Sequence, residues 1–390
     1  MHEELVERRR WVGHDPFLHA LQFCMVLPGP EAQQLATYLG WRLHGTRGGL
    51  IAGTLFVAPA AAILLGLSLI YVLWGTTPAV AGILRGLQPA VVALIIGALI
   101  TMGRRVLRNP GAGIIAVAAA AAIGIGNAPF PLVIALAGFV GLLRPRTASA
   151  KGCPPGHTAV PSMEPEIHPG WTRAARILGL GSLLWLTPMG LLAAVLGLDH
   201  VVVQEGLFFG KAALVTFGGA YAVLPYVAQQ AVEQFHWLGP DAMMQGLALA
   251  ETTPGPLVIV LQFVGFLGGW NHPGPLPRIV SAALGAAITL WSTFLPSFLW
   301  IFLGAPWVQR WRSMPRLQGV LDSIGAAVVG VLASLGFWVG SRTLLPGNHV
   351  DIPAILLTIV AFCGLRVFKW PPGYVVAGCA LVGWIAQSFR

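Results

Sequence analysis

Two identical Pro-Gly-Pro motifs interrupt long apolar stretches of the sequence, at Pro28-Gly29-Pro30 and at Pro254-Gly255-Pro256. Proline removes a backbone N–H and clashes with the preceding helical turn, and glycine weakens a helix further. A helix that begins after such a break points its free N–H groups and positive dipole end into the break, which favours an anion. Gln33 and Gln34 follow the first motif, and Thr253 precedes the second. We therefore predict that both motifs and these three side chains bind a substrate; a structural kink is the alternative.

A glycine pair within Phe217-Gly218-Gly219-Ala220-Tyr221 interrupts another apolar stretch. Tandem glycines permit a concave array of backbone N–H donors, so Phe217, Gly218, Gly219 and Tyr221 are further substrate-binding candidates. Lys211 lies six residues before this motif, and an ionisable side chain inside an apolar segment is a functional candidate by default. The alternative is a structural lysine that reaches the interface or pairs with Glu205, although six residues is a poor spacing for pairing on one straight helix.

Four charged residues are candidates for proton coupling or gating: Glu31, Arg85, Glu233 and Glu251. Glu31 and Glu251 flank the two Pro-Gly-Pro breaks. For Glu233 the alternative is an exposed carboxylate at a helix end. Arg85 lies inside an apolar segment and its matched position in the second half is Asp322, so the two could pair, with simple interfacial placement as the alternative.

Signatures of metal, cofactor and enzyme sites are absent from the sequence. The ten histidines form no HxxxH pair, and the four cysteines show no paired spacing. GxSxG and Walker motifs are also missing. We expect no cofactor, no metal and no enzymatic activity.

The composition places these motifs in a membrane protein. The chain carries 23 Lys+Arg and 14 Asp+Glu in 390 residues, 9% charged, whereas soluble domains have about 25%. The apolar runs are continuous and do not alternate, which indicates an all-α polytopic membrane protein and not a barrel. The net charge of +9 is scattered between apolar segments, so it indicates membrane topology and no nucleic-acid partner.

Spanning helices need about 20 apolar residues, and several candidates here are shorter, so they must tilt, pair or thin the bilayer. The uninterrupted candidates are residues 49–74, 78–102, 111–126, 129–143, 173–197, 276–304, 315–342, 351–365 and 371–386. Three interrupted candidates are residues 16–43, 201–234 and 239–269.

The chain repeats itself. Trp11, Gly13 and the first Pro-Gly-Pro recur 226 residues later as Trp237, Gly239 and the second Pro-Gly-Pro. Further along the offset becomes 237. We predict a first membrane domain over residues 1–143, a cytoplasmic linker over 144–172, and a connector helix with a second membrane domain over 173–390. Duplicated broken helices are typical of secondary transporters, which predicts an inverted-repeat arrangement whose halves rock against each other.

The basic residues orient these halves. If every candidate crosses once, 15 basic residues share the side of the linker and 6 lie on the other, in agreement with the positive-inside rule. A competing interpretation makes the two Pro-Gly-Pro segments re-entrant hairpins, and the charge count favours single crossings only moderately.

The motifs together resemble the chromate ion transporter (CHR) family. The resemblance rests on residues 7–11 (ERRRW), residues 27–36 (LPGPEAQQLA) and residues 217–227 (FGGAYAVLPYV), with Glu233, Trp237 and residues 253–256. It implies a two-domain inner-membrane oxyanion carrier that confers chromate resistance by efflux, with sulfate as a look-alike substrate. The family carries a Phe-Gly-Gly-Pro motif upstream of ERRRW; its register here falls before Met1, so we expect a late or misassigned start.

We therefore expect a secondary active transporter that exports chromate, or a related oxyanion such as sulfate, across the bacterial inner membrane. Its partners would be the oxyanion, the lipid bilayer and, as a coupling ion, a proton; a homodimer is compatible with the sequence. A membrane enzyme acting on a lipid or polyprenyl phosphate, and a non-transporting homologue, are the alternatives.

Overall fold

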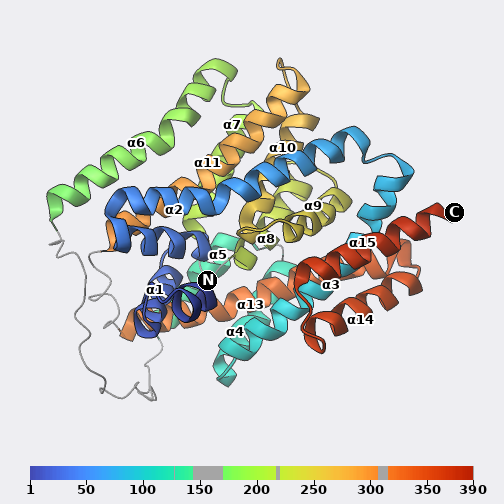
Figure 1. The fold of residues 1–390 in the computed structure, drawn as a ribbon, viewed down its shortest axis with the longest axis horizontal. Coiled ribbons are helices and arrows are strands. Elements are labelled where there is room, and N and C mark those ends of the chain that lie inside the picture. Colours follow the sequence, from blue (N-terminus) through green and yellow to red (C-terminus); the bar gives the residue numbers. More distant parts are fainter. Residues whose placement is uncertain (127, 144–169, 217–219, 306–314, 390) are drawn as a thin grey trace.

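A computed structural model describes the chain except residues 127, 144–169, 217–219, 306–314 and 390 (Figure 1). The described part consists of helices joined by short loops and contains no strand. The elements of the first half are η1 (Glu3–Arg8), α1 (His14–Val26), α2 (Glu31–Trp74), α3 (Pro78–Val106), α4 (Pro110–Gly124) and α5 (Phe130–Leu143). The second half contains α6 (Trp171–Leu196), α7 (Val201–Val215), α8 (Ala220–Gln229), η2 (Gln230–Gln234), α9 (Pro240–Thr252), η3 (Leu257–Ile259), α10 (Val260–Asn271), α11 (Arg278–Gly304), α13 (Pro315–Leu344), η5 (Pro346–Asn348), α14 (Ile352–Arg366) and α15 (Pro372–Ser388).

Within this described part, five helices are long and apolar enough to cross a membrane. They lie in α2, α3, α6, α11 and α13, with mean hydropathies between 1.7 and 2.3. α6 buries only 6% of its most apolar window, and its exposed side chains include Leu180, Leu183 and Leu184. Such a surface needs lipid around it, so the all-α polytopic membrane class is confirmed.

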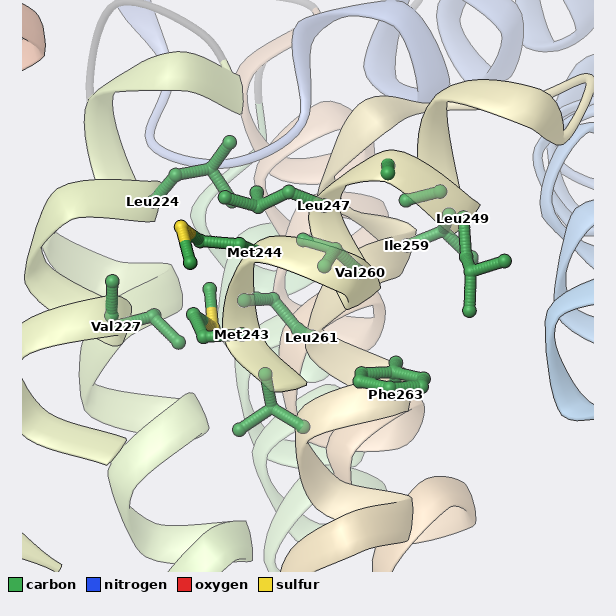
Figure 2. Packing of buried hydrophobic residues seen from close by; sticks show 14 of the residues in the cluster. Leu224, Val227, Met243, Met244, Leu247, Leu249, Ile259, Val260, Leu261 and Phe263 are labelled. Carbon is green, nitrogen blue, oxygen red and sulfur yellow. The ribbon is translucent and has the colours of Figure 1, made fainter. Parts of the chain in front are cut away.

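Each Pro-Gly-Pro motif reverses the direction of the chain. The rings of Phe23 in α1 and Tyr38 in α2 are 5.3 Å apart, on opposite sides of the first break. At the second break, a Cβ at Gly246 of α9 would touch the Phe263 ring of α10, and Figure 2 shows the two helices side by side. The Asn271 amide also donates to the Trp237 carbonyl at 2.8 Å, which joins the far ends of this hairpin.

α8 lies back against α7, because the Phe208 and Tyr226 rings are 5.3 Å apart. In a continuous helix, 18 residues would separate two side chains by about 27 Å. α1 and α9 have 13 residues each, about 20 Å, which is too short for the hydrocarbon core of about 30 Å. The single-crossing prediction for the interrupted segments is therefore wrong, and the re-entrant alternative fits.

With hairpins in place of single crossings, the basic residues are divided more unequally between the two sides of the membrane. If each interrupted segment returns to the side from which it enters, Arg8, Arg9 and Arg10 move to the side of the linker. That side then holds 18 basic residues and the other holds 3, in place of 15 and 6. The positive-inside rule thus agrees better with hairpins than with single crossings.

α2 is itself two antiparallel helices, because His44 and Gly45 have non-helical backbone angles. A Cβ at Gly40 would meet Ala52 beyond this kink, so the two parts lie against each other. The second half builds the same unit from α10 and α11, which pack together over their lengths. Local geometry repeats as well: Arg10 and His236, 226 residues apart, have φ values of 53° and 52°.

The two halves are wrapped around each other. α4 and α5 of the first half pack along α13 of the second, whereas α14 and α15 pack along α3 of the first. Small residues make these crossings close: Gly383 lies against Gly82, and Gly141 lies against Gly319, the residue that matches Gly82 at the 237 offset. The halves of the sequence are therefore not separate lobes of the structure (Figure 1).

Candidate functional site

The two Pro-Gly-Pro turns each contact a proline-containing helix of the opposite half. Gly29 lies against Ser297 of α11, directly after Pro296. Gly255 lies against Ala60 of α2, directly after Pro59. Ser297 and Ala60 are matched at the 237 offset, just as the two glycines are matched at 226. The same contact is thus made twice, with the halves exchanged.

The first turn is buried and tightly held. Gly29 has a φ of 127°, which only glycine adopts readily. Its N–H donates to the Thr216 carbonyl at 2.8 Å, and the Gln34 amide donates to the Pro28 carbonyl at 2.8 Å. Thr216 is the last residue before the Phe217-Gly218-Gly219 motif, so the structure brings the first break to the edge of that motif.

This turn collects buried polar atoms that lack a partner among the described residues. They are the Ser297 hydroxyl and the side-chain oxygens of Gln33 and Gln34, all from residues with 0% exposure. The Gln33 amide nitrogen donates to Thr37 at 3.1 Å. Buried polar groups without partners are costly, and they mark places where a ligand or water completes the hydrogen bonds.

The second turn differs in chemistry. Pro254 and Gly255 are exposed, and their neighbour across the halves is the methyl group of Ala60 in place of a hydroxyl. Thr253 is buried, but its hydroxyl already donates a hydrogen bond to the Ala250 carbonyl at 2.7 Å. Of the two predicted turns, the first therefore has the free polar groups a polar substrate needs.

Other predicted residues fall elsewhere. Phe217, Gly218 and Gly219 lie outside the described residues, and Tyr221 is in the first turn of α8. Lys211 is on the exposed side of α7, away from its buried face.

Of the predicted coupling residues, Glu233 is exposed in η2 and Arg85 is exposed on α3. Arg85 donates to the Gln387 side chain at 3.2 Å, so its contact is with α15 and not with Asp322. Glu31 is half-buried at the start of α2, and Glu251 is half-buried in the last turn of α9.

Sequence reasoning missed the polar face of α11. Its buried hydroxyls are Ser281, Thr289, Ser292, Thr293 and Ser297, and none has a hydrogen-bond partner among the described residues. Successive members are 8, 3, 1 and 4 residues apart, which at about 100° per residue places all five on one half of the helix circumference, a signal that was present in the sequence. Pro296 leaves the Ser292 carbonyl without its helical donor, and the Trp185 indole of α6 donates to it at 3.3 Å.

Comparison with known proteins gives a family match over most of the chain. The family model described as "Chromate transporter" matches residues 1–142 and 203–384. The chain is 32% identical to the chromate transport protein of Pseudomonas aeruginosa, over 99% of this chain and 86% of that protein. It is 27% identical to the chromate transport protein of Cupriavidus metallidurans, over 99% of this chain and 87% of that protein. No solved structure gives a significant match.

Proposed function

Because this chain belongs to the chromate transporter family, a family of transporters and not enzymes, we propose that it carries chromate or a related oxyanion such as sulfate across the membrane. Transport is secondary active and directed outward, across the bacterial inner membrane, and it confers resistance to chromate. The relatives that match nearly the whole chain support this proposal, since they are named for chromate transport.

The observation that carries the proposal is the buried polar turn at Gly29, where the Ser297 hydroxyl has no partner among the described residues and the amides of Gln33 and Gln34 lie nearby. A doubly charged tetrahedral anion loses a large hydration energy when it leaves water, and burying a fixed counter-ion with it would be costly. Hydroxyl and amide donors avoid a fixed counter-charge. The Ser297 hydroxyl is free to donate, and the amides of Gln33 and Gln34 can exchange their present bonds for bonds to the anion.

The remaining predicted residues take supporting roles in this proposal. Pro28 and Pro30 hold the turn open, and Phe217, Gly218, Gly219 and Tyr221, which follow Thr216 in the sequence, are further proposed contacts of the substrate. Thr253, Pro254, Gly255 and Pro256 form the less polar counterpart on the other half. Lys211, exposed on α7, attracts the anion toward the site and does not stay bound to it.

The exchanged packing of the halves defines which parts move. Because α14 and α15 are packed on α3, and α4 and α5 on α13, the two sequence halves cannot rock as separate rigid bodies without breaking these contacts. We infer that the hairpins α1–α2 and α9–α10 move against a scaffold formed by α3 and α13. Glu31 and Glu251 stand at the two hairpin turns and would gate this motion, with Arg85 and Glu233 at the periphery.

Uptake of labelled chromate by inverted vesicles, with and without a proton gradient and with sulfate as a competitor, tests this function. The expected result is gradient-dependent uptake that sulfate reduces. Uptake no higher than in vesicles lacking the protein would overturn the proposal.

A further inference from the structure

Glu205 carries a fully buried carboxyl group in the second turn of α7. Its exposure is 0%, and neither oxygen has a hydrogen-bond partner among the described residues. One oxygen lies against Gly268 of α10 and the other against Gly285 of α11. A Cβ at either glycine would collide with the carboxyl, so both helices leave space for this one side chain.

No described cation compensates the charge of this carboxyl. α10 contains no titratable residue, and α11 contributes only Arg278, exposed at its first turn. Arg173 and Arg176 of α6 lie at that helix's start, and Lys211 is on the exposed side of α7. The nearby titratable groups are Asp199 and three histidines: His200, His236 and His272. A carboxylate in this position without a counter-ion is costly, whereas a neutral acid is tolerated.

A pocket of about 550 Å³ is lined by Gln204, the residue before Glu205, and by Trp237, which lies between the pocket and the glycine that Glu205 contacts. Its lining includes Asp199, His200, Gln204, Trp237 and His272. Trp237 links the pocket to Glu205. A Cβ built at Gly268 would lie 3.3 Å from the Trp237 Cβ, and it would also meet a Glu205 carboxyl oxygen. His200 receives a hydrogen bond from the Val202 N–H at Nδ1, so its other ring nitrogen carries the proton toward the Pro273 carbonyl at 3.3 Å.

The polar face of α11 leads from Glu205 to the proposed substrate turn. Ser281 lies near the start of the helix, and Gly285 faces the Glu205 carboxyl. The remaining buried hydroxyls continue along the helix to the residue beside Gly29: Thr289, Ser292, Thr293 and Ser297. Gly285 and Ser297 are 12 residues apart, about 18 Å along the helix. Elsewhere, buried hydroxyls such as Ser68 and Thr358 donate to their own helix, at 2.7 and 2.8 Å. The α11 hydroxyls do not, and so remain free to hold water or relay a proton.

From this geometry we propose that Glu205 is the proton-binding group that couples oxyanion transport to the proton gradient. The carboxylate takes a proton from the histidine-lined pocket and becomes a neutral acid. When the hairpins move, it releases that proton along the α11 hydroxyls toward the Gly29 turn, and the carboxylate forms again. The coupling role rests on the proposed transport function, whereas proton binding itself does not.

Glu205→Gln in the full chain tests the proposal, because glutamine has the shape of the protonated acid and cannot release a proton. In reconstituted vesicles, we expect proton-gradient-driven chromate uptake to fall to the level of protein-free vesicles, while exchange of labelled for unlabelled chromate persists. Persistent exchange also shows that the variant is folded. Asp322→Asn, which removes an exposed carboxylate from α13, is the matched control and should retain both activities. Gradient-driven uptake by the Glu205→Gln protein at the wild-type level would overturn the proposal.

An infrared measurement separates this inference from the transport function. The wild-type-minus-variant difference spectrum should contain a carboxylic acid C=O band that titrates with pH. Absence of that band overturns proton binding at Glu205. A wild-type protein that moves no chromate but shows the band would refute the transport function and leave the proton site supported.

Discussion

The hydroxyl of Ser297 occupies the space that a side chain at Gly29 would need, although 268 positions separate the two residues in the sequence. Gly29 belongs to the first half and Ser297 to the second, and the matched pair Gly255 and Ala60 reverses that relationship. At the matched positions, Ser297 carries a hydroxyl and Ala60 carries only a methyl group. The two matched turns of the duplicated chain are therefore chemically different: the turn at Gly29 is polar and the turn at Gly255 is apolar.

Replacement of Gly29 by alanine should destabilise the protein by about 1–3 kcal/mol, because a φ of 127° is strained for alanine and its Cβ would collide with Ser297 and Gln34. Transport should be lost together with stability. Thermal unfolding in detergent and chromate uptake measure the two effects. Gly66→Ala is the matched control, since its Cβ would meet nothing within 4 Å. Equal melting temperatures for the two variants would contradict the tight turn.

Ser297→Ala should leave folding unchanged, because alanine stands at the matched position 60 in the same fold. It removes one donor to a charged ligand, so KM for chromate should rise about tenfold, equivalent to about 1.4 kcal/mol. The kinetics of vesicle uptake provide the measurement. Ser388→Ala at the exposed end of α15 serves as the control. An unchanged KM would exclude the Ser297 hydroxyl from the binding site.

The contact between Gly82 and Gly383 should tolerate no larger side chain. Gly383→Leu would drive its side chain into the backbone of α3, and we expect a loss of about 1–3 kcal/mol or failure to accumulate folded protein. Gly378→Leu on the same helix faces open space and should be neutral. Size-exclusion chromatography and melting temperature compare the two. If the Gly383 variant is as stable as the Gly378 variant, the exchanged packing of α15 on α3 is incorrect.

The hairpin at the second break predicts that its two ends lie on the same face of the membrane. In a cysteine-free background, Gly239→Cys and His272→Cys should react with a membrane-impermeant maleimide from the same side. A segment that crossed once would place them on opposite sides. Thr77→Cys and Arg108→Cys, which flank the continuous helix α3, should label from opposite sides and so control for the method.

The N-terminal π-helix should loosen in acid. The hydrogen bond from Arg9, at 2.7 Å, lowers the pKa of Glu4 below its ordinary value, and the bond from Arg8 adds to this. A lowered folded-state pKa means that the stabilisation is present above the unfolded pKa and is lost as the pH falls through the folded value, in the acid range below the ordinary glutamate pKa of about 4.3. Hydrogen–deuterium exchange over residues 4–12, corrected for the intrinsic rate, should rise in that range. Glu4→Gln should abolish the pH dependence; identical profiles would contradict the argument.

Local sequence chemistry predicted much of this protein. The scarcity of charge and the continuous apolar runs are properties of composition, and they fixed the all-α membrane class. The matched motifs located both helix breaks, since Pro-Gly-Pro disrupts a helix wherever it stands. The short helices α4, α5 and α14, with 14 or 15 residues each, also follow from the lengths of the apolar runs.

Site prediction was less complete. Gly29, Gln33 and Gln34 were predicted from the motif, whereas Ser297 and Glu205 were not. The α11 hydroxyl pattern was a signal for Ser297, but nothing in the sequence shows that Ser297 faces Gly29 or that Glu205 is buried. Glu205 was noted only as a neighbour of Lys211, and the structure places Lys211 on the exposed side of α7 while Glu205 is buried. Most residues of α7 are apolar, so the sequence has no strong helical period that tells which side of the helix faces the protein interior. The burial of Glu205 could therefore not be inferred.

The sequence alone therefore determined the class of protein, its duplication, its broken helices and its family. Only the tertiary structure decided that the breaks are reversals, that each half packs around the other, and that the polar turn joins Gly29 to Ser297. The physical reason is the distance along the sequence over which each effect acts. Propensity and hydrophobicity act over a few residues, whereas these features depend on contacts between side chains that lie hundreds of residues apart and meet only when the helices pack.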